Sequence, residues 1–134
     1  MVKLHGHRTV MPSVEEFKMT AIADLATLVE AREAVRQVRL TDEIVDYVVD
    51  IVRATRGRPT LSCGASPRSA NMLASASRAV AVLRGRDFVT PDDVKSLAVH
   101  ALRHRIVLAP GAEIEGLTAE AVVRQVLDQV AAPR

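Results

Sequence analysis

The sequence predicts a single all-α domain, a helical bundle of about five helices. Of its 134 residues 49% are hydrophobic, yet there is no Trp, one Tyr and two Phe, so the core is expected to consist of Ala, Val, Leu and Ile. Apolar residues recur at helical spacing in several segments, and most of these segments open with a recognisable start signal. A chain of this length can bury a core without disulfides or a structural metal.

The first helix is expected from about Ile22 to Val35. Residues 1 to about 20 show no helical period and are interrupted by Pro12, although the run Ser13-Val14-Glu15-Glu16 fits a capping box for a short helix. The inner face of the Ile22 to Val35 helix is expected to carry Leu25, Leu28, Val29 and Val35. A short connection then leads to Thr41.

Thr41 is expected to cap a second helix, about Asp42 to Thr55, which has acidic residues in its first turn and ends before Gly57. Its inner face should contain Ile44, Val48, Ile51 and Val52. The segment from Gly57 to Ala65, with Pro59 and Gly64, is predicted to be a loop.

The pentad Gly64-Ala65-Ser66-Pro67-Arg68 marks the start of the third helix. Ser66 suits the N-cap and Pro67 the first helical position, so Arg68 falls in the first turn, where backbone N–H groups favour an anion. Its guanidinium suits phosphate, which suggests a phosphate-sensing arginine; the alternative is a surface arginine behind an ordinary Ser-Pro helix start. The helix continues to Leu83 and stops at Gly85. Its inner face is expected to carry Leu73, Ala76, Val80 and Leu83.

Two further helices are expected in the C-terminal part. Thr90-Pro91-Asp92-Asp93 combines a threonine cap, a proline and two acids, and opens a helix to about His104. Arg105 to Leu108 fits an extended segment, and Pro110 with Gly111 a turn. Thr118 caps the last helix, Ala119 to Val130. The buried residues predicted for these two helices are Val94, Leu97, Ala98, Ala101, Leu102, Val122, Val123, Val126 and Leu127.

Positive charge is concentrated in the middle of the chain, although the net charge is only +2. Seven arginines and no Asp or Glu lie between Arg53 and Arg86, at positions 53, 56, 58, 68, 78, 84 and 86. Such a patch would attract polyanions or acidic partners. The alternative is a solvated surface that happens to be basic.

Several chemistries are excluded or disfavoured. There is no phosphate-binding loop and no apolar run ending in paired acids, so the chain alone is not expected to hydrolyse nucleotides. His100 and His104 have the spacing of a zinc pair, but Ala101 stands where a general-base glutamate is needed and no third ligand is evident, so no metal site is predicted. Cys63 is interpreted as a small loop residue. No secretory signal or membrane span is recognised, and a lone cysteine fits a cytoplasmic protein.

Motifs along the chain resemble those in the C-terminal lid of MoxR-type AAA+ ATPases. In order, they are Ile51-Val52-Arg53-Ala54-Thr55-Arg56, Gly64-Ala65-Ser66-Pro67-Arg68-Ser69, Gly85-Arg86-Asp87-Phe88-Val89-Thr90-Pro91-Asp92-Asp93-Val94 and His104-Arg105-Ile106. The resemblance covers roughly Leu25 to Val130, and an ordered set is more specific than any single motif. It implies an AAA+ lid fold over residues 21–134, with residues 1–20 a connector from a nucleotide-binding subdomain that this sequence lacks.

The resemblance also implies a function. The G-A-S-P-R element would be the sensor 2 motif, with Arg68 reaching the γ-phosphate of ATP and with Gly64, Ser66 and Pro67 setting its helix. ATP and Mg would bind only with the nucleotide-binding subdomain, and no cofactor is expected for the isolated chain. The partners implied are that subdomain and the neighbouring subunits of a ring, a hexamer in the parent protein, which remodels client proteins as a chaperone does. Arg56, Arg84 and Arg86 are candidates for subunit contacts.

A different class of function remains open from the residues themselves. The arginine-rich stretch would suit a stand-alone basic helical module that binds nucleic acid or an acidic protein. The lack of a base-reading recognition helix and the scarcity of aromatic residues argue against nucleic acid. A purely structural oligomerisation domain is a third alternative.

Overall fold

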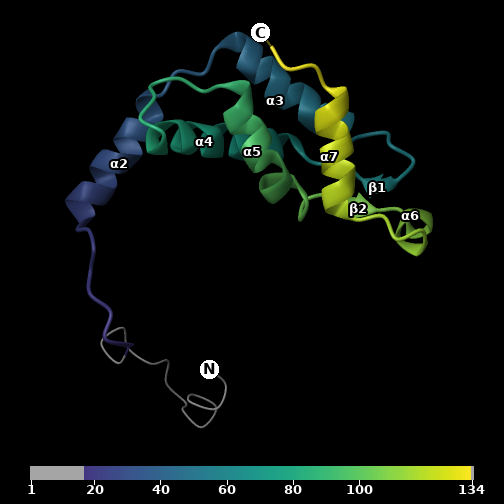
Figure 1. Cartoon of the computed structure of the whole chain (residues 1–134), viewed down its shortest axis with the longest axis horizontal. Helices are drawn as coiled ribbons and strands as arrows, with labels where there is room; N and C mark the ends of the chain where they lie inside the picture. The colour runs from purple at the N-terminus through teal and green to yellow at the C-terminus, as the bar shows by residue number, and fades with distance from the viewer. Residues whose placement is uncertain (1–16, 134) are drawn as a thin grey trace. The chain divides into compact units, whose positions relative to one another are not determined.

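The computed structural model, drawn in Figure 1, describes residues 17–133. These residues divide into two compact units, residues 17–32 and 33–133. Helix α2 (Leu25–Gln37) begins in the first unit and ends in the second. It starts three residues later than the expected Ile22, because the Asp24 carboxylate caps it by accepting hydrogen bonds from the backbone N–H and hydroxyl of Thr27, at 2.8 and 2.7 Å. The hydrogen bond from the Thr27 backbone, and to a smaller extent the one from its hydroxyl, lower the pKa of the Asp24 carboxyl. The Ser13 capping box lies outside the described residues.

The inner face predicted for this first helix is wrong. No residue of α2 is buried, and the three apolar residues expected to face a core are more than half exposed, whereas Val35 is half-buried. The exposed residues are Leu25, Leu28 and Val29.

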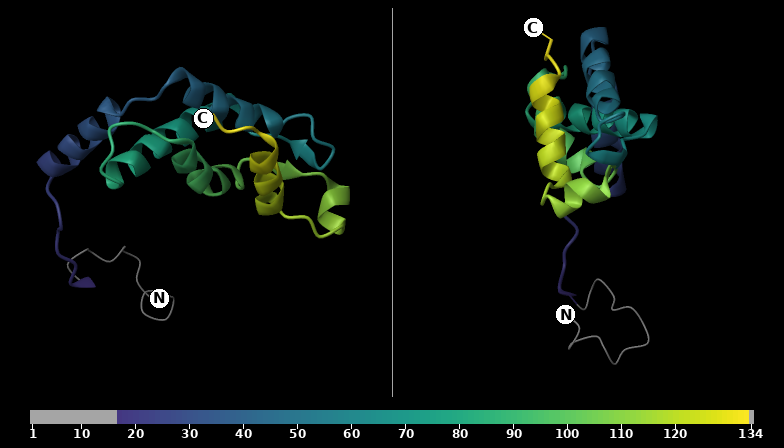
Figure 2. Two further views of the ribbon diagram at one scale, coloured as in Figure 1. Left: turned by 45° about the horizontal axis from the view of Figure 1, so that its top comes forward. Right: turned by 90° about the vertical axis from the view of Figure 1, so that its right-hand side faces the viewer.

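The second unit confirms the all-α prediction. Its main helices are α3 (Asp42–Ala54), α4 (Pro67–Leu83), α5 (Pro91–Leu102) and α7 (Ala119–Gln129). Helix α3 contacts α4, α5 and α7, while α5 lies against α4 on one side and α7 on another, as the views in Figures 1 and 2 agree. None of the helices in the described range is long and apolar enough to cross a membrane.

Two small elements were missed in the sequence. Within the predicted loop, β1 (Leu61–Cys63) pairs antiparallel with β2 (Val107–Leu108), the segment that was expected to be extended. The predicted turn at Pro110 is instead a short helix, α6 (Pro110–Ile114), with Ala112 buried. Both elements are too short for hydrophobic periodicity to reveal them.

The core confirms most of the predicted inner positions. All four predicted residues of α3 are buried, as are Val94, Ala98 and Leu102 in α5 and Val122, Val123 and Val126 in α7. Leu97, Ala101 and Leu127 are half-buried. Tyr47 and Val99 are additional buried residues.

Of the inner face predicted for helix α4, only Leu73 is fully buried. Its buried residues are spaced four apart and are mostly small: Ser69, Leu73, Ser77 and Ala81. Ala76 and Val80 are half-buried, and Leu83 is 86% exposed. Small side chains allow close helix contact, and the Ser77 hydroxyl satisfies itself by donating to the Leu73 carbonyl at 2.8 Å. The apolar periodicity did not predict this face because two of its four buried residues are serines.

Helix α4 ends as predicted at Gly85, in a Schellman motif. The N–H of Gly85 donates to the Val82 carbonyl and that of Arg86 to the Ala81 carbonyl, at 2.8 and 2.9 Å. Gly85 has φ +69°, a conformation that glycine adopts readily. The chain then turns directly into the connection to α5.

Candidate functional site

The start of α4 lies where the pentad predicts it. Ser66 occupies the N-cap in an extended conformation and Pro67 is the first helical residue. However, the Ser66 hydroxyl does not cap the backbone as expected. It lies 3.3 Å from the Ser69 hydroxyl, and the Ser69 N–H bonds to the Ser66 carbonyl instead, at 2.9 Å.

The residues just before α4 are held against the end of α3. A Cβ on Gly64 would lie 2.6 Å from the Thr55 carbonyl oxygen, so only glycine allows the two backbone segments to approach this closely. Ala65 is fully buried, and its N–H donates to the Thr55 hydroxyl at 2.9 Å. Its carbonyl accepts from the Nε–H of Arg56, also at 2.9 Å. The sequence placed this glycine in the motif but did not reveal the partners Thr55 and Arg56.

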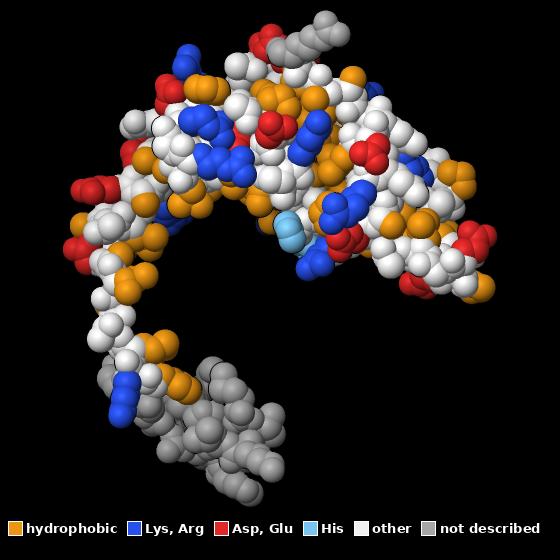
Figure 3. Space-filling model, in the orientation of Figure 1, with side chains coloured by type: hydrophobic (Ala, Val, Ile, Leu, Met, Phe, Trp, Pro, Cys, Tyr) orange, Lys and Arg blue, Asp and Glu red, His pale blue; other side chains and the backbone are white. Residues whose placement is uncertain are grey.

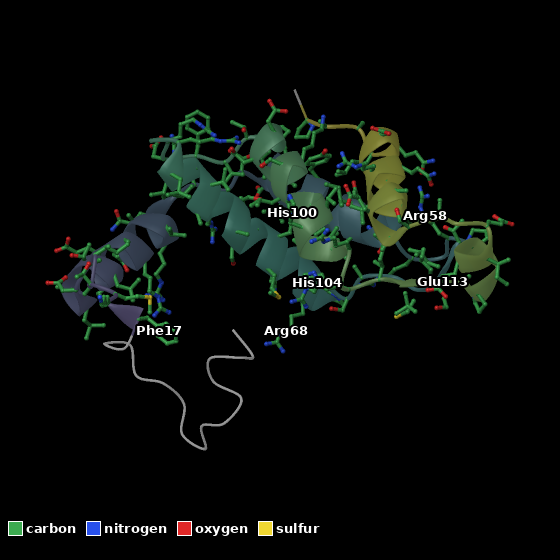
Figure 4. All side chains as sticks on the ribbon, turned by 60° about the horizontal axis from the view of Figure 1, so that its bottom comes forward. Phe17, Arg58, Arg68, His100, His104 and Glu113 are labelled. Carbon is green, nitrogen blue, oxygen red and sulfur yellow. The ribbon has the colours of Figure 1, made fainter. Side chains whose placement is uncertain are left out.

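Arg68 is exposed in the first turn of α4 (Figure 4). Its side chain extends away from the helix, and its guanidinium makes no hydrogen bond or ion pair with any residue between 17 and 133. All of its donors are therefore available to a group from outside this part of the chain.

Arg84 and Arg86 converge on Asp93 in the first turn of α5. The carboxylate is fully buried and accepts from Arg84 Nη1 at 2.7 Å and from Arg86 Nη1 and Nη2 at 2.8 and 2.6 Å. It also accepts from the backbone N–H and hydroxyl of Thr90, each at 2.9 Å. Asp93 thus completes the helix start that the sequence predicted and also joins the two ends of the connection between α4 and α5.

The electrostatics of this cluster follow from its geometry. Burial of the Asp93 carboxyl would raise its pKa, but the hydrogen bonds from Arg86 and Thr90, together with the positive charge of Arg86, hold that pKa well below its usual range. The same hydrogen bond raises the pKa of Arg86. Asp93 is therefore ionised at neutral pH and offsets part of the positive charge of the two arginines.

The predicted basic stretch is consequently less uniform than its sequence. Arg58 donates to the Ala54 carbonyl at 3.0 Å and to the Gln129 side chain, and Arg84 and Arg86 share a carboxylate. On the face shown in Figure 3, acidic and basic side chains are interspersed over residues 33–133. The roles suggested for Arg56, Arg84 and Arg86 in subunit contacts remain predictions, although each of the three has a partner within the domain.

The other candidates are placed as follows. Cys63 is exposed in β1, with its thiol 3.5 Å from the Gly64 carbonyl. His100 and His104 lie at and just beyond the C-terminal end of α5 (Figure 4). Among residues 17–133, no three His, Cys, Asp or Glu side chains gather in a group that could hold a metal ion.

Comparison with known proteins agrees with this fold and these motifs. Residues 53–126 match the family described as AAA lid domain. The uncharacterized protein YeaC of Bacillus subtilis is 44% identical over 99 residues, covering 74% of this chain and 31% of the relative. Chaperone MoxR1 of Mycobacterium tuberculosis is 40% identical over 100 residues, covering 68% of this chain and 26% of the relative.

A solved structure from Cytophaga hutchinsonii, described as a "putative ATPase", superposes with a TM-score of 0.78 at 29% identity, over 81% of this chain and 36% of that one. This chain therefore belongs to the AAA lid domain family. Its similarity to proteins named MoxR confirms the predicted resemblance to the lids of MoxR-type proteins. The chain spans less than a third of the length of YeaC and MoxR1, at 31% and 26%.

Proposed function

We propose that this lid places Arg68 against the γ-phosphate of ATP bound on an AAA+ nucleotide-binding subdomain. The single observation that carries the proposal is the guanidinium of Arg68, which has no partner among residues 17–133 and stands at a helix start anchored to the domain core. An exposed arginine with no partner gains most from an external anion, since its five donors match phosphate oxygens. The backbone dipole of α4 adds to the attraction.

The proposed mechanism converts a local charge change into a domain motion. While ATP is bound, Arg68 donates charge-assisted hydrogen bonds to the γ-phosphate and holds the lid over the nucleotide. Hydrolysis and release of phosphate remove the acceptor, and the lid rotates. The ATP and its Mg would be held by the nucleotide-binding subdomain, because this sequence has no phosphate-binding loop and residues 17–133 contain no group of three His, Cys, Asp or Glu side chains that could hold a metal ion.

In a ring of AAA+ subunits, this rotation would be passed to the neighbouring subunit and used to remodel a client protein. The name of the Mycobacterium tuberculosis relative, Chaperone MoxR1, supports that role. The proposed parent protein is therefore a chaperone of the MoxR type that hydrolyses ATP, and we propose that it acts in the cytoplasm.

The test mixes this chain with the part of the Bacillus subtilis relative that this chain does not match, which the proposal takes to be the nucleotide-binding part. Binding of a non-hydrolysable ATP analogue and of ADP is measured by calorimetry. The Arg68→Ala variant loses charge-assisted hydrogen bonds worth about 1.5–3 kcal/mol. It should therefore bind the ATP analogue roughly 10- to 150-fold more weakly than the wild type does. The affinity for ADP should change less than about twofold, because ADP lacks the γ-phosphate.

Arg53→Ala is the matched control, since Arg53 is an exposed arginine of the same stretch whose side chain has no partner among residues 17–133. It should leave both affinities unchanged. Equal binding of the ATP analogue by wild type and Arg68→Ala would show that the assignment is wrong. Salt-sensitive retention of this chain on duplex DNA, without any nucleotide effect, would favour the basic binding module instead.

A further inference from the structure

We infer that Thr55 and Arg56, at the end of α3, are positioning residues that fix Arg68 in its place by clamping the peptide groups of Ala65. This inference rests on the function proposed for Arg68. Neither residue was assigned this role from the sequence, in which Arg56 was considered for subunit contacts.

The Thr55 hydroxyl acts both as a hydrogen-bond donor and as an acceptor. Its hydroxyl donates to the Val52 carbonyl of α3 at 2.6 Å and accepts from the Ala65 N–H at 2.9 Å, and the residue is fully buried. Because the donated bond fixes the hydroxyl rotor, the lone pair that meets Ala65 points in a fixed direction. The last turn of α3 thereby determines where the Ala65 N–H lies.

Arg56 holds the other side of the same residue. Its Nε–H donates to the Ala65 carbonyl at 2.9 Å. The side chain reaches this position because Gly64 lacks a Cβ, which would otherwise lie 2.9 Å from Arg56 Cγ. With both its N–H and its carbonyl bonded, Ala65 has fixed peptide planes on its two sides.

Only two residues separate this clamp from Arg68. Ser66 is extended at the N-cap and the ring of Pro67 restricts its own φ, so the chain between Ala65 and the first turn of α4 has little freedom. An error in the placement of Ala65 therefore passes directly to the Arg68 backbone. A misplacement of about 1 Å costs a charge-assisted contact much of its strength.

The test compares the ATP analogue with ADP in the same mixture of this chain and the nucleotide-binding part of the relative. Thr55→Val removes the hydroxyl that accepts from Ala65, and Arg56→Ala removes the Nε–H that donates to Ala65. Each variant should bind the ATP analogue about 3- to 10-fold more weakly than the wild type, while its affinity for ADP should change by less than about twofold. Thr55→Ser keeps the hydroxyl and should restore binding of the analogue. A variant that merely disrupts the fold would lower the affinities for the ATP analogue and for ADP together. A change in the ratio of these two affinities therefore indicates that Arg68 is misplaced.

A double-mutant cycle shows whether the clamp acts through Arg68. In the Arg68→Ala background, Arg56→Ala and Thr55→Val should cause no further loss of analogue binding. A full additional loss in that background would overturn the inference, because it would mean that Arg56 contacts the nucleotide or a neighbouring subunit directly.

The outcomes also separate this inference from the proposed function. If Arg68→Ala weakens binding of the analogue and neither clamp variant does, the clamp is wrong and the sensor stands. If Arg68→Ala has no effect, the proposed function fails and the clamp with it. Thermal unfolding followed by circular dichroism checks that each variant is folded at the binding temperature. Arg56→Ala alters an exposed side chain and keeps the test available should Thr55→Val unfold.

Discussion

Replacing Asp93 by Asn is expected to be among the most destabilising single changes in this domain. The substitution keeps the shape of the side chain and removes its charge. The carboxylate is fully buried and accepts five hydrogen bonds, three from Arg84 and Arg86 and two from Thr90. An amide cannot accept all of these, since its NH2 group is a donor that would face the guanidinium N–H groups.

The magnitude follows from the geometry. Removing one partner of a buried ion pair costs about 3–5 kcal/mol, because it leaves uncompensated charge. The Arg84 side chain is 49% exposed and that of Arg86 is 25% exposed, so water can solvate the two guanidinium groups after they lose the carboxylate. We therefore expect a loss of stability at the lower end of this range, about 3 kcal/mol. For a domain of this size, that corresponds to a fall in Tm of roughly 10 °C.

The effect should also depend on pH. The pKa of the Asp93 carboxyl is lower in the folded protein than its unfolded value of about 3.9. The stability that it contributes is therefore fully present at neutral pH and is lost as the pH falls below about 4 towards the folded pKa. The difference in Tm between wild type and Asp93→Asn should narrow as the pH is lowered through this range.

Thermal unfolding followed by circular dichroism measures both quantities. Asp92→Asn is the matched control, because Asp92 lies in the same first turn but is exposed, and its effect should stay within about 0.3–1 kcal/mol. If Asp93→Asn melted within about 2 °C of wild type at pH 7, the reasoning from the buried ion pair would be refuted.

Two further substitutions test the packing. Gly64→Ala should cost about 1–3 kcal/mol, because its Cβ would meet the Thr55 carbonyl at 2.6 Å and force the backbone to shift; Gly111→Ala, with no atom within 4 Å of a Cβ, serves as its control in chemical denaturation. Leu73→Ala should cost about 2–5 kcal/mol because the side chain is fully buried, whereas Leu83→Ala, on a side chain that is 86% exposed, should change stability by less than about 0.5 kcal/mol. Similar losses for Leu73→Ala and Leu83→Ala would contradict the observed face of α4.

The candidate site was predictable only in part. Local signals placed Pro67 at the first helical position and Arg68 in the first turn, because helix starts depend on neighbouring residues. Ser66 occupies the predicted N-cap position, but its hydroxyl does not bond to the backbone of the first turn and lies beside the Ser69 hydroxyl instead. Thr55 could not be connected to the pentad because nothing local links a helix end to a residue ten positions later.

The charge distribution around Arg84 and Arg86 also could not be predicted from the sequence. Counting arginines between positions 53 and 86 predicted a concentrated basic patch, since every acid lay outside that window. The fold brings Asp93 back to Arg84 and Arg86 across the turn between α4 and α5, so part of the charge is compensated. Charge along a sequence predicts charge in space only where the chain does not fold back on itself.

Neighbouring residues along the chain set the helical class, most helix boundaries, the inner faces of α3, α5 and α7, and the position of Arg68 in the first turn of α4. These depend on interactions within one or two turns, namely capping, proline geometry and apolar spacing. The burial of serines on α4, and the hydrogen bonds from Thr55 and Arg56 to Ala65, depend on contacts between segments that lie apart in the sequence. Such choices depend on which surfaces meet, because a buried polar group is tolerated only where the folded chain supplies its hydrogen-bond partner.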